Sequence, residues 1–173
     1  MQNAISITEL PKSLTKFTTL FATLDPIPET AVAGIYRGEF VGPTWLQKIA
    51  PPGLKLLRFG GWWGKWLQEN GEGNNITASN GTLHPFMPIT FETRPSLLDN
   101  KLCLAILYPS QSPFPWRHVI DELRILDNGV YLGMTITNLP LVNKLPFPFI
   151  LNAQPTGPEV TAFQENYIHT VAV

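Results

Sequence analysis

A helical pattern comes first along the chain. Apolar residues recur at spacings of three and four, at Leu10, Leu14, Phe17, Phe21 and Leu24. This spacing predicts a helix with one apolar face, which we expect to pack on a sheet. Thr8 or Glu9 can precede the helix, Pro11 is tolerated in its first turn, and Asp25-Pro26-Ile27-Pro28 ends it.

Short apolar stretches separated by turn residues follow, and this alternation is typical of a β protein. Strands are predicted at 31–40, 86–94, 101–108 and 145–151, with a bent strand or strand pair at 54–67. A short helix is predicted at Trp45–Ala50, closed by Pro51-Pro52-Gly53, and loops are predicted at 68–81 and 109–115.

The C-terminal part is less regular. Pro146 and Pro148 cannot donate to a β-ladder, so 145–151 is expected to be an edge or interrupted strand. The tail that follows is expected to end in a short strand, Tyr167–Val173.

The strongest local signal is a β-hairpin, because Val119–Leu126 and Val130–Thr137 flank the turn sequence Asp127-Asn128-Gly129. A two-residue turn at Asn128-Gly129 predicts a definite register, which pairs Ile125 with Leu132, Leu123 with Met134, and Asp121 with Ile136. One face is then apolar except for Asp121. On the other face, Arg124 and Glu122 are expected to pair with each other at the surface or rim.

Composition supports one mainly β domain. The chain has 173 residues, with 17 Pro, 13 Gly and 11% aromatic residues, which favours short strands and many turns. We predict an antiparallel β-barrel or strongly curved sheet, lipocalin-like, with an N-terminal α-helix. The single domain comprises a helix and connection (1–28), a β core (31–151) and a C-terminal tail (152–173).

The charge pattern limits the partners. The formal net charge is −1 and charged residues make up 14%, and no Lys/Arg cluster stands out, so a nucleic-acid partner is not expected. No apolar run approaches the roughly 20 residues that span a bilayer, so no membrane insertion is expected. Without a secretory start, and with Cys103 as the only cysteine, a cytoplasmic location is expected. Sparse charge favours self-association, for example as a homodimer.

Three local patterns resemble a known family. Gly34-Ile35-Tyr36-Arg37-Gly38 resembles a G-x-W-x-G strand with Tyr in place of Trp, and Gly61-Trp62-Trp63-Gly64-Lys65 resembles the G-W-Y-G-K segment after it. His118–Arg124 with Leu132-Gly133-Met134 is similar to the closing hairpin of the same family. Residues 31–151 therefore resemble the GXWXG-type domain-of-unknown-function family.

The resemblance implies no established reaction. Glu122-Leu123 stands where the family has His-Phe, which puts any His-dependent chemistry at that position in doubt. The opening strand is also similar, as a fold-level analogy, to lipocalin-like barrels and to haem-binding nitrobindin-like barrels. No cofactor is identified, and haem is the one that this analogy allows.

Asp121 is the most informative single residue. A carboxylate on an apolar strand face is costly when buried without a partner, so it must meet a cation, several donors or a water-lined cavity. The family resemblance points to Arg37 and Lys65 as its partners.

Other side chains could surround the same space. Trp62 and Trp63 are adjacent, so a strand sends them to opposite faces and at most one lines a cavity. Large aromatics beside glycines also commonly plug the end of a barrel. Gly34, Gly38, Gly64 and Gly133 fall in expected strands and are expected to leave room inside.

The histidines show no metal-ligand spacing, so no metal site is predicted. Of His84, His118 and His169, we expect His84 to be the functional one, because it ends a loop before a strand. The candidate ligand-binding residues are Tyr36, Arg37, Trp62, Trp63, Lys65, His84, Tyr108 and Asp121.

Three functions stay open. The leading hypothesis is a binding protein for a small, mostly apolar molecule in an internal cavity. The first alternative is an enzyme of the isomerase, cyclase or hydratase class, acting on an apolar substrate with Asp121 as its acid or base. The second is a protein–protein interaction domain without a ligand.

Overall fold

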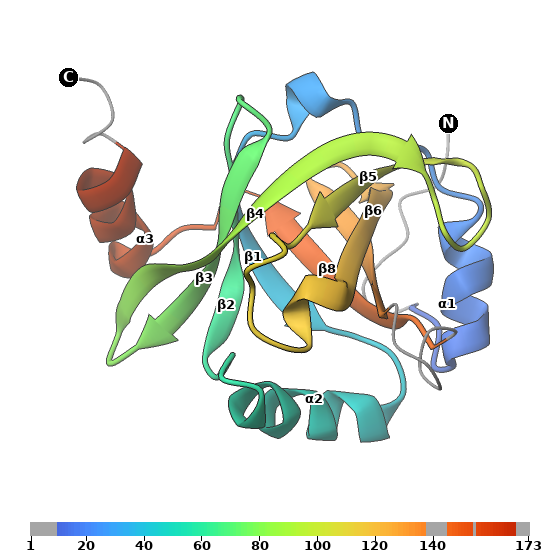
Figure 1. Ribbon diagram of the computed structural model, residues 1–173, viewed down its shortest axis with the longest axis horizontal. Coiled ribbons are helices and arrows are strands. Elements are labelled where there is room, and N and C mark those ends of the chain that lie inside the picture. Colours follow the sequence, from blue (N-terminus) through green and yellow to red (C-terminus); the bar gives the residue numbers. More distant parts are fainter. Residues whose placement is uncertain (1–9, 138–144, 154, 169–173) are drawn as a thin grey trace.

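The computed structural model describes residues 10–137, 145–153 and 155–168. In these ranges eight antiparallel strands, each paired with its neighbours in sequence, form a closed barrel (Figure 1). The strands are β1 (Gly34–Phe40), β2 (Trp62–Leu67), β3 (Glu72–Ser79), β4 (Thr82–Pro95), β5 (Leu102–Leu107), β6 (Val119–Asp127), β7 (Val130–Thr137) and β8 (Phe147–Ala153). The predicted fold class, a mainly β antiparallel barrel with an N-terminal helix, is confirmed.

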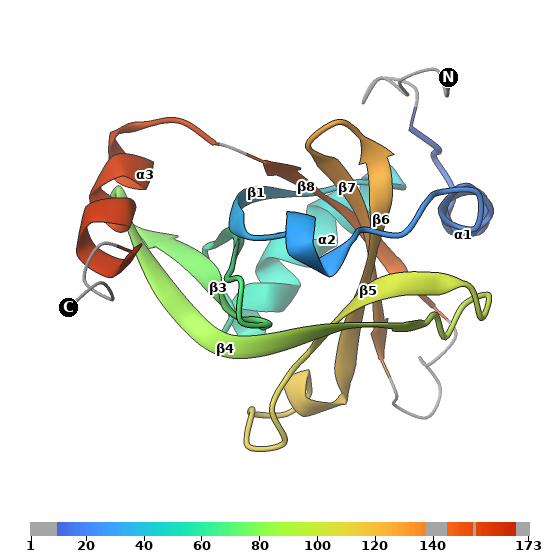
Figure 2. The same ribbon diagram turned by 90° about the horizontal axis from the view of Figure 1, so that it is seen from above.

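Within the described residues, three helices lie outside the barrel wall. α1 (Leu14–Phe21) and α3 (Pro158–Phe163) lie at opposite ends of the longest axis, and α2 (Thr44–Leu56) lies across one end of the barrel (Figures 1 and 2). Short helical turns occur at Glu29–Ala31, Trp116–His118 and Gln164–Ile168.

α1 covers one side of the barrel. Ser13 caps its first turn by accepting a hydrogen bond from the Lys16 N–H, and Thr8 and Glu9, the predicted starts, lie outside the described residues. Phe17 and Phe21 are fully buried against the outer surface of β5–β8. The predicted packing of an apolar helix face on the sheet is therefore confirmed.

Two predicted loops or breaks are wrong. The stretch 68–81 was predicted to be a loop because it is polar, but it contains strand β3. One of its polar residues, Asn75, lies inside the barrel, where it accepts a hydrogen bond from Lys65. The prolines at 51 and 52 do not end the helix: α2 continues to Leu56, so 54–56 is helical and the strand begins only at Trp62. Leu46 of this helix is buried and Leu54 packs against the barrel core, and this packing overrides the local preference of proline.

The C-terminal predictions also change. β8 pairs with both β7 and β1, so it is not an edge strand. Pro148 is tolerated because it is the second residue of β8, at the end of the ladder. Tyr167 and Ile168 lie in a helical turn rather than a strand, and the remainder of the predicted strand 167–173 lies outside the described residues.

The hairpin is present, but its predicted register is wrong by one residue. Leu126 forms a bulge in β6, so Ile125 pairs with Tyr131 and Asp121 pairs with Thr135. The bulge leaves the inward residues of β6 unchanged and reverses the faces of β7. Asp121 therefore has a hydroxyl opposite it where the sequence predicted isoleucine.

The predicted surface pair of Arg124 and Glu122 is wrong, because both side chains are fully buried on the outer face of β6. Arg124 forms two hydrogen bonds with Asp99, at 2.6 and 2.7 Å, and also donates to the carbonyl of Phe21 at the end of α1. Glu122 accepts hydrogen bonds from the Ser96 hydroxyl and the Leu97 N–H. These charges anchor the β4–β5 connection and α1 to the barrel.

Gly133→Ala is expected to destabilise the barrel by about 1–3 kcal/mol, because its new Cβ would lie 2.2 Å from the Phe149 ring. Gly53→Ala is the matched control, since a Cβ there meets nothing within 4 Å and alanine favours a helix interior. Urea denaturation of both variants measures the difference. Equal stabilities would contradict the tight contact at Gly133.

Asp99→Asn is expected to lower the free energy of unfolding by about 1–3 kcal/mol at pH 7, because buried Arg124 loses its charged partner. Hydrogen bonds from Arg124 hold the pKa of Asp99 below its ordinary value. The carboxylate therefore stabilises the fold above that ordinary value, near 3.9, and the contribution is lost as pH falls through the lowered pKa.

The stability difference between wild type and Asp99→Asn should therefore shrink below about pH 4. Urea denaturation at pH 7 and at acid pH measures it, with the exposed Asp25→Asn as control. A difference that does not change with pH would contradict the role of this pair.

Candidate functional site

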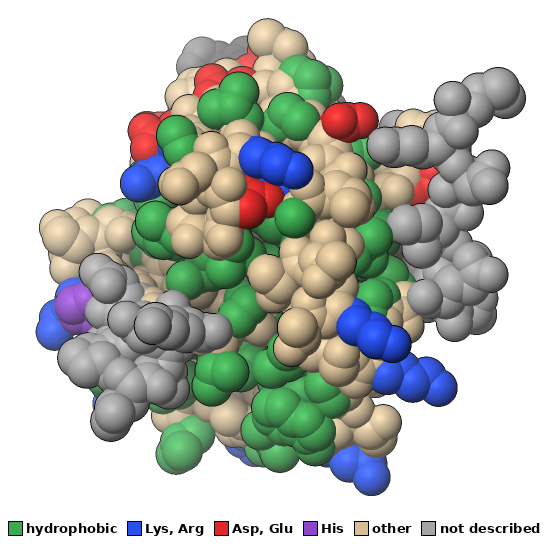
Figure 3. Space-filling view, turned by 90° about the vertical axis from the view of Figure 1, so that its right-hand side faces the viewer, with side chains coloured by type: hydrophobic (Ala, Val, Ile, Leu, Met, Phe, Trp, Pro, Cys, Tyr) green, Lys and Arg blue, Asp and Glu red, His purple; other side chains and the backbone are tan. Residues whose placement is uncertain are grey.

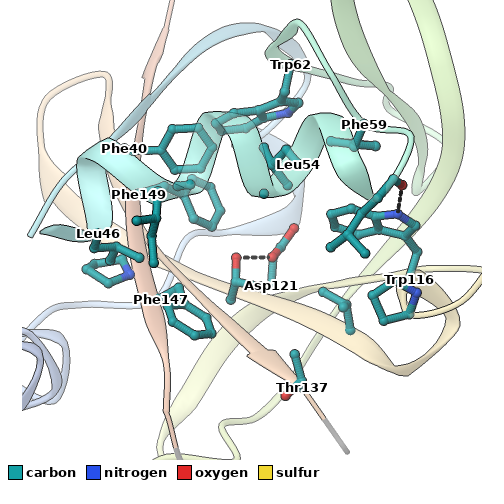
Figure 4. A pocket seen from close by; sticks show the side chains of 18 of the residues that line it. Phe40, Leu46, Leu54, Phe59, Trp62, Trp116, Asp121, Thr137, Phe147 and Phe149 are labelled. Carbon is teal, nitrogen blue, oxygen red and sulfur yellow. Dashed lines mark hydrogen bonds between the residues drawn. The ribbon is translucent and has the colours of Figure 1, made fainter. Parts of the chain in front are cut away.

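A cavity of about 260 Å³ lies between α2 and the end of the barrel (Figure 4). Apolar side chains of α2 form one wall, and aromatic side chains of the barrel and its connections form the others. A small polar group lies deeper, around Asp121. The lining residues include Leu46, Ile49, Ala50, Leu54, Phe40, Phe59, Trp62, Trp116, Phe147, Phe149, Lys65, Tyr108, Asp121, Thr135 and Thr137.

Asp121 is 3% exposed and accepts three charge-assisted or hydroxyl hydrogen bonds. Lys65 Nζ lies 2.9 Å from Oδ2, and the Tyr108 hydroxyl donates to the same oxygen at 3.0 Å. The Thr135 hydroxyl donates to Oδ1 at 2.7 Å. The predicted pairing of Asp121 with a cation is confirmed for Lys65.

Lys65 is 1% exposed and has partners for all three ammonium protons. Besides Asp121 it donates to Asn75 Oδ1 at 2.8 Å and to the Tyr108 oxygen at 3.2 Å. Its Nζ also lies within 6.0 Å of the ring centres of Trp62, Tyr108 and Phe149. A fully satisfied buried ammonium is a fixed structural charge rather than a free binding group.

An irregularity in β2 brings Trp62 and Lys65 to the same side. Three residues apart, the two would point to opposite faces of a regular strand. The pairing of β2 with β3 shifts between Trp62 and Gly64, and this bulge turns both side chains into the barrel. Trp63 then lies on the outer surface, which agrees with the expectation that only one of the two tryptophans lines a cavity.

Burial changes the acidity of Tyr108. Desolvation, and then the neighbouring charge of Asp121, raise the pKa of this phenol well above its ordinary value. The hydroxyl therefore stays protonated near neutral pH and acts as a hydrogen-bond donor to Asp121.

Two interior glycines accommodate aromatic rings. A Cβ on Gly38 would lie 2.3 Å from the Trp62 ring, and one on Gly133 would lie 2.2 Å from the Phe149 ring. The volume that these glycines leave is therefore occupied by rings that lie flat against the wall. Gly64 serves a different purpose, because a Cβ there would meet the Tyr36 carbonyl of β1 at 1.9 Å.

Trp62 carries an unsatisfied polar atom. Its indole Nε1–H is buried and has no hydrogen-bond partner among the described residues, although Trp62 lines the cavity. A buried donor of this kind is costly to leave unpaired, so it is a second polar position beside the apolar walls.

The other predicted site residues lie elsewhere. Tyr36 is inside the barrel, where its hydroxyl donates to the Val32 carbonyl at 2.7 Å and burial raises its pKa. Arg37 does not contact Asp121: it lies over the Trp63 ring and donates to the Trp63 carbonyl on the outside. His84 is exposed on β4, and His169 lies outside the described residues. Trp62, Lys65, Tyr108 and Asp121 are the predicted residues that meet at the cavity.

Several site residues were missed from the sequence. Asn75 lies in the polar stretch that was predicted to be a loop. Thr135 was assigned to the opposite face because the predicted register did not include the bulge at Leu126. The α2 side chains that form one wall of the cavity were not predicted to do so, and the helix was expected to end at Ala50 rather than Leu56. Trp116 follows a loop and donates to the Leu57 carbonyl at 3.2 Å, a contact that no local pattern indicates.

Comparison with known proteins adds information on the fold. No protein-family model matches the chain, and no curated protein matches it significantly in sequence. The fold is similar to that in a crystal structure of a protein from Thermomonospora curvata, with a TM-score of 0.61 and 16% identity over 82% of this chain and 87% of that chain. At this identity the likeness shows a shared fold alone. The resemblance to the GXWXG-type family stays a prediction.

The described ranges contain neither a metal-binding cluster nor a membrane-spanning helix. There, no three His, Cys, Asp or Glu side chains gather closely enough to hold a metal ion. None of the helices in those ranges combines the length and the apolar character that crossing a bilayer requires. Cys103 is buried, and burial raises the pKa of its thiol to about 12, as expected for an unreactive cysteine.

Lys65→Met and Asp121→Asn are each expected to destabilise the barrel by about 3–5 kcal/mol, because each leaves the other charge buried without its partner. The double variant should cost clearly less than the sum of the two, with a coupling of about 1–3 kcal/mol. Urea denaturation of the four proteins measures this cycle. Additive effects would contradict a direct ion pair.

Proposed function

We propose that this barrel binds one small, mostly apolar molecule in the cavity beneath α2. The observation that supports this most strongly is the combination of apolar and aromatic walls with a compact polar group around Asp121. Ligand pockets in proteins have this composition, and the volume of about 260 Å³ lies just below their usual range of roughly 300–1,000 Å³, which suits a small ligand.

The polar group favours one kind of ligand. Lys65 already uses its three protons, so it offers no free cation to a ligand carboxylate. Asp121 Oδ1 accepts from Thr135 and has a further lone-pair direction, since each carboxylate oxygen can accept two hydrogen bonds. The Thr135 hydroxyl oxygen can accept as well. The site therefore suits a neutral ligand with a hydrogen-bond donor, such as a hydroxyl group, on an apolar body.

An enzyme with Asp121 as its acid or base is the alternative that this geometry also permits, because the carboxylate and the Tyr108 hydroxyl lie together at the cavity. We favour binding, since both carboxylate oxygens already accept hydrogen bonds from the protein. If a substrate is found, unchanged turnover by Asp121→Asn would remove this residue from the mechanism.

A matched series of probes tests the binding proposal: 2-naphthol, naphthalene and 2-naphthoate. The hydroxyl group of 2-naphthol can donate a hydrogen bond to the site, so 2-naphthol should bind about fivefold to tenfold more tightly than naphthalene. This ratio corresponds to the net free energy of one hydrogen bond. The naphthoate should bind most weakly, because its charge would lie beside Asp121. Isothermal titration calorimetry measures the three affinities.

Cavity variants provide the control. Ala50→Trp places a large side chain in the cavity and should abolish naphthol binding, whereas Gln47→Trp on the exposed face of the same helix should leave it unchanged. Binding that survives Ala50→Trp, or a preference for the naphthoate, would contradict the proposal. Native mass spectrometry of protein from its native host would identify a retained ligand.

A further inference from the structure

α2 has two apolar faces, and only one of them lines the cavity. Leu46, Ala50 and Leu54 point toward the barrel. On the opposite side, Trp45 is 51% exposed and Leu56 is 85% exposed, and their spacing places them on one helical stripe. Ile49, 54% exposed, lies between the faces and belongs to both. Soluble proteins rarely leave such a stripe uncovered without a function.

Cations surround this stripe. Lys48, Lys55 and Arg58 are all exposed, and the sequence has no acidic residue between Glu39 and Glu69. The chain as a whole has a net charge of −1, so the positive charge is a local property of this end of the barrel. The three cations lie within the eleven residues 48–58, on and just after α2.

The neighbouring connection extends the same surface. Trp116 is hydrogen-bonded to the Leu57 carbonyl at the end of α2. Next to it, Phe114 is 60% exposed and Arg117 is exposed. Figure 3 shows apolar side chains gathered at the lower part of one face, at the level of α2 in Figure 1.

We propose that this basic apolar surface, defined by Trp45, Lys48, Ile49, Lys55, Leu56 and Phe114, docks on an anionic lipid bilayer. A helix with exposed apolar side chains and flanking cations lies in the interface of a membrane without crossing it. Trp45 suits the headgroup level, and Lys or Arg side chains near an anionic surface strengthen the binding.

Charge argues against a second copy of the chain as the occupant. In a two-fold dimer through this surface, the same patch would face itself. Lys48, Lys55 and Arg58 would then share one interface with their copies, and the segment supplies no carboxylate to pair with them. An anionic bilayer instead complements the cations and the apolar stripe together.

Docking would place the cavity beside the lipid, because Ile49 is both exposed and part of the cavity wall. An apolar ligand concentrates in the bilayer and could be taken up there. The docking itself stands on the outer face of α2 and does not require that the cavity hold a ligand.

Vesicle co-sedimentation tests the proposal. The protein should bind vesicles of phosphatidylcholine mixed with phosphatidylglycerol, bind phosphatidylcholine vesicles at least tenfold less, and lose affinity as salt rises. Lys48→Glu/Lys55→Glu and Trp45→Ser/Leu56→Ser should each reduce binding to the mixed vesicles by tenfold or more. All four positions are exposed, so thermal unfolding should stay close to wild type.

Matched variants outside the surface are the controls. Lys12→Glu/Lys16→Glu changes exposed lysines near α1, and Leu97→Ser changes a leucine that is 55% exposed; both should bind vesicles like wild type. Equal loss in the controls, or equal binding to neutral vesicles, would overturn the proposal.

A dimer in analytical ultracentrifugation that Trp45→Ser/Leu56→Ser abolishes would also overturn it and assign the face to self-association. Naphthol titration of the same variants separates lipid docking from cavity binding.

Discussion

The ion pair of Lys65 and Asp121 inside the barrel is the constraint on which the interior depends. Two charges removed from water destabilise a fold unless each is paired and fully hydrogen-bonded. Here the partners come from four strands and one connection: Lys65 from β2, Asn75 from β3, Tyr108 after β5, Asp121 from β6 and Thr135 from β7. The network is complete only when the sheet is curved enough to bring these strands around one point.

The same constraint shapes the cavity. The polar network occupies the middle of the barrel. Aromatic side chains surround the end beneath α2, and they pack against the barrel wall rather than across its opening. Trp62 and Phe149 lie over Gly38 and Gly133, where an ordinary side chain would displace them. The helix that covers this end contributes apolar groups on both sides, and this links the proposed ligand cavity to the proposed lipid surface.

Outside the barrel, charged residues of β6 take a structural role. Arg124 and Glu122 are buried beneath α1 and the β4–β5 connection, where Asp99, Ser96 and backbone groups satisfy them. Both faces of β6 are therefore buried, with Asp121 on the inner face and Glu122 and Arg124 on the outer face. In such a strand, polar and apolar residues do not alternate as they do in a half-exposed strand. Arg124 and Glu122 were therefore predicted to lie at the surface.

Much of the fold could be predicted from local patterns. The apolar spacing from Leu14 to Phe21, the hairpin around Asn128-Gly129 and the glycine and proline content indicated a barrel with an N-terminal helix. The need of Asp121 for a cation followed from the free energy of burying a charge, and Lys65 was named among its partners through the family resemblance. These features depend on neighbours in sequence or on one residue's chemistry.

Only the tertiary structure decided the rest. The bulges at Leu126 and after Trp62 determine which residues face inward, so they place Thr135 beside Asp121 and bring Trp62 and Lys65 together. Asn75 reaches the site because β3 pairs with β2, which carries Lys65. The helix α2 continues through two prolines because its leucines pack against the end of the barrel. The sequence alone determined that a buried carboxylate in a β protein needs a partner. Which strands supplied it depended on ladder register and long-range packing, since local preferences do not encode either.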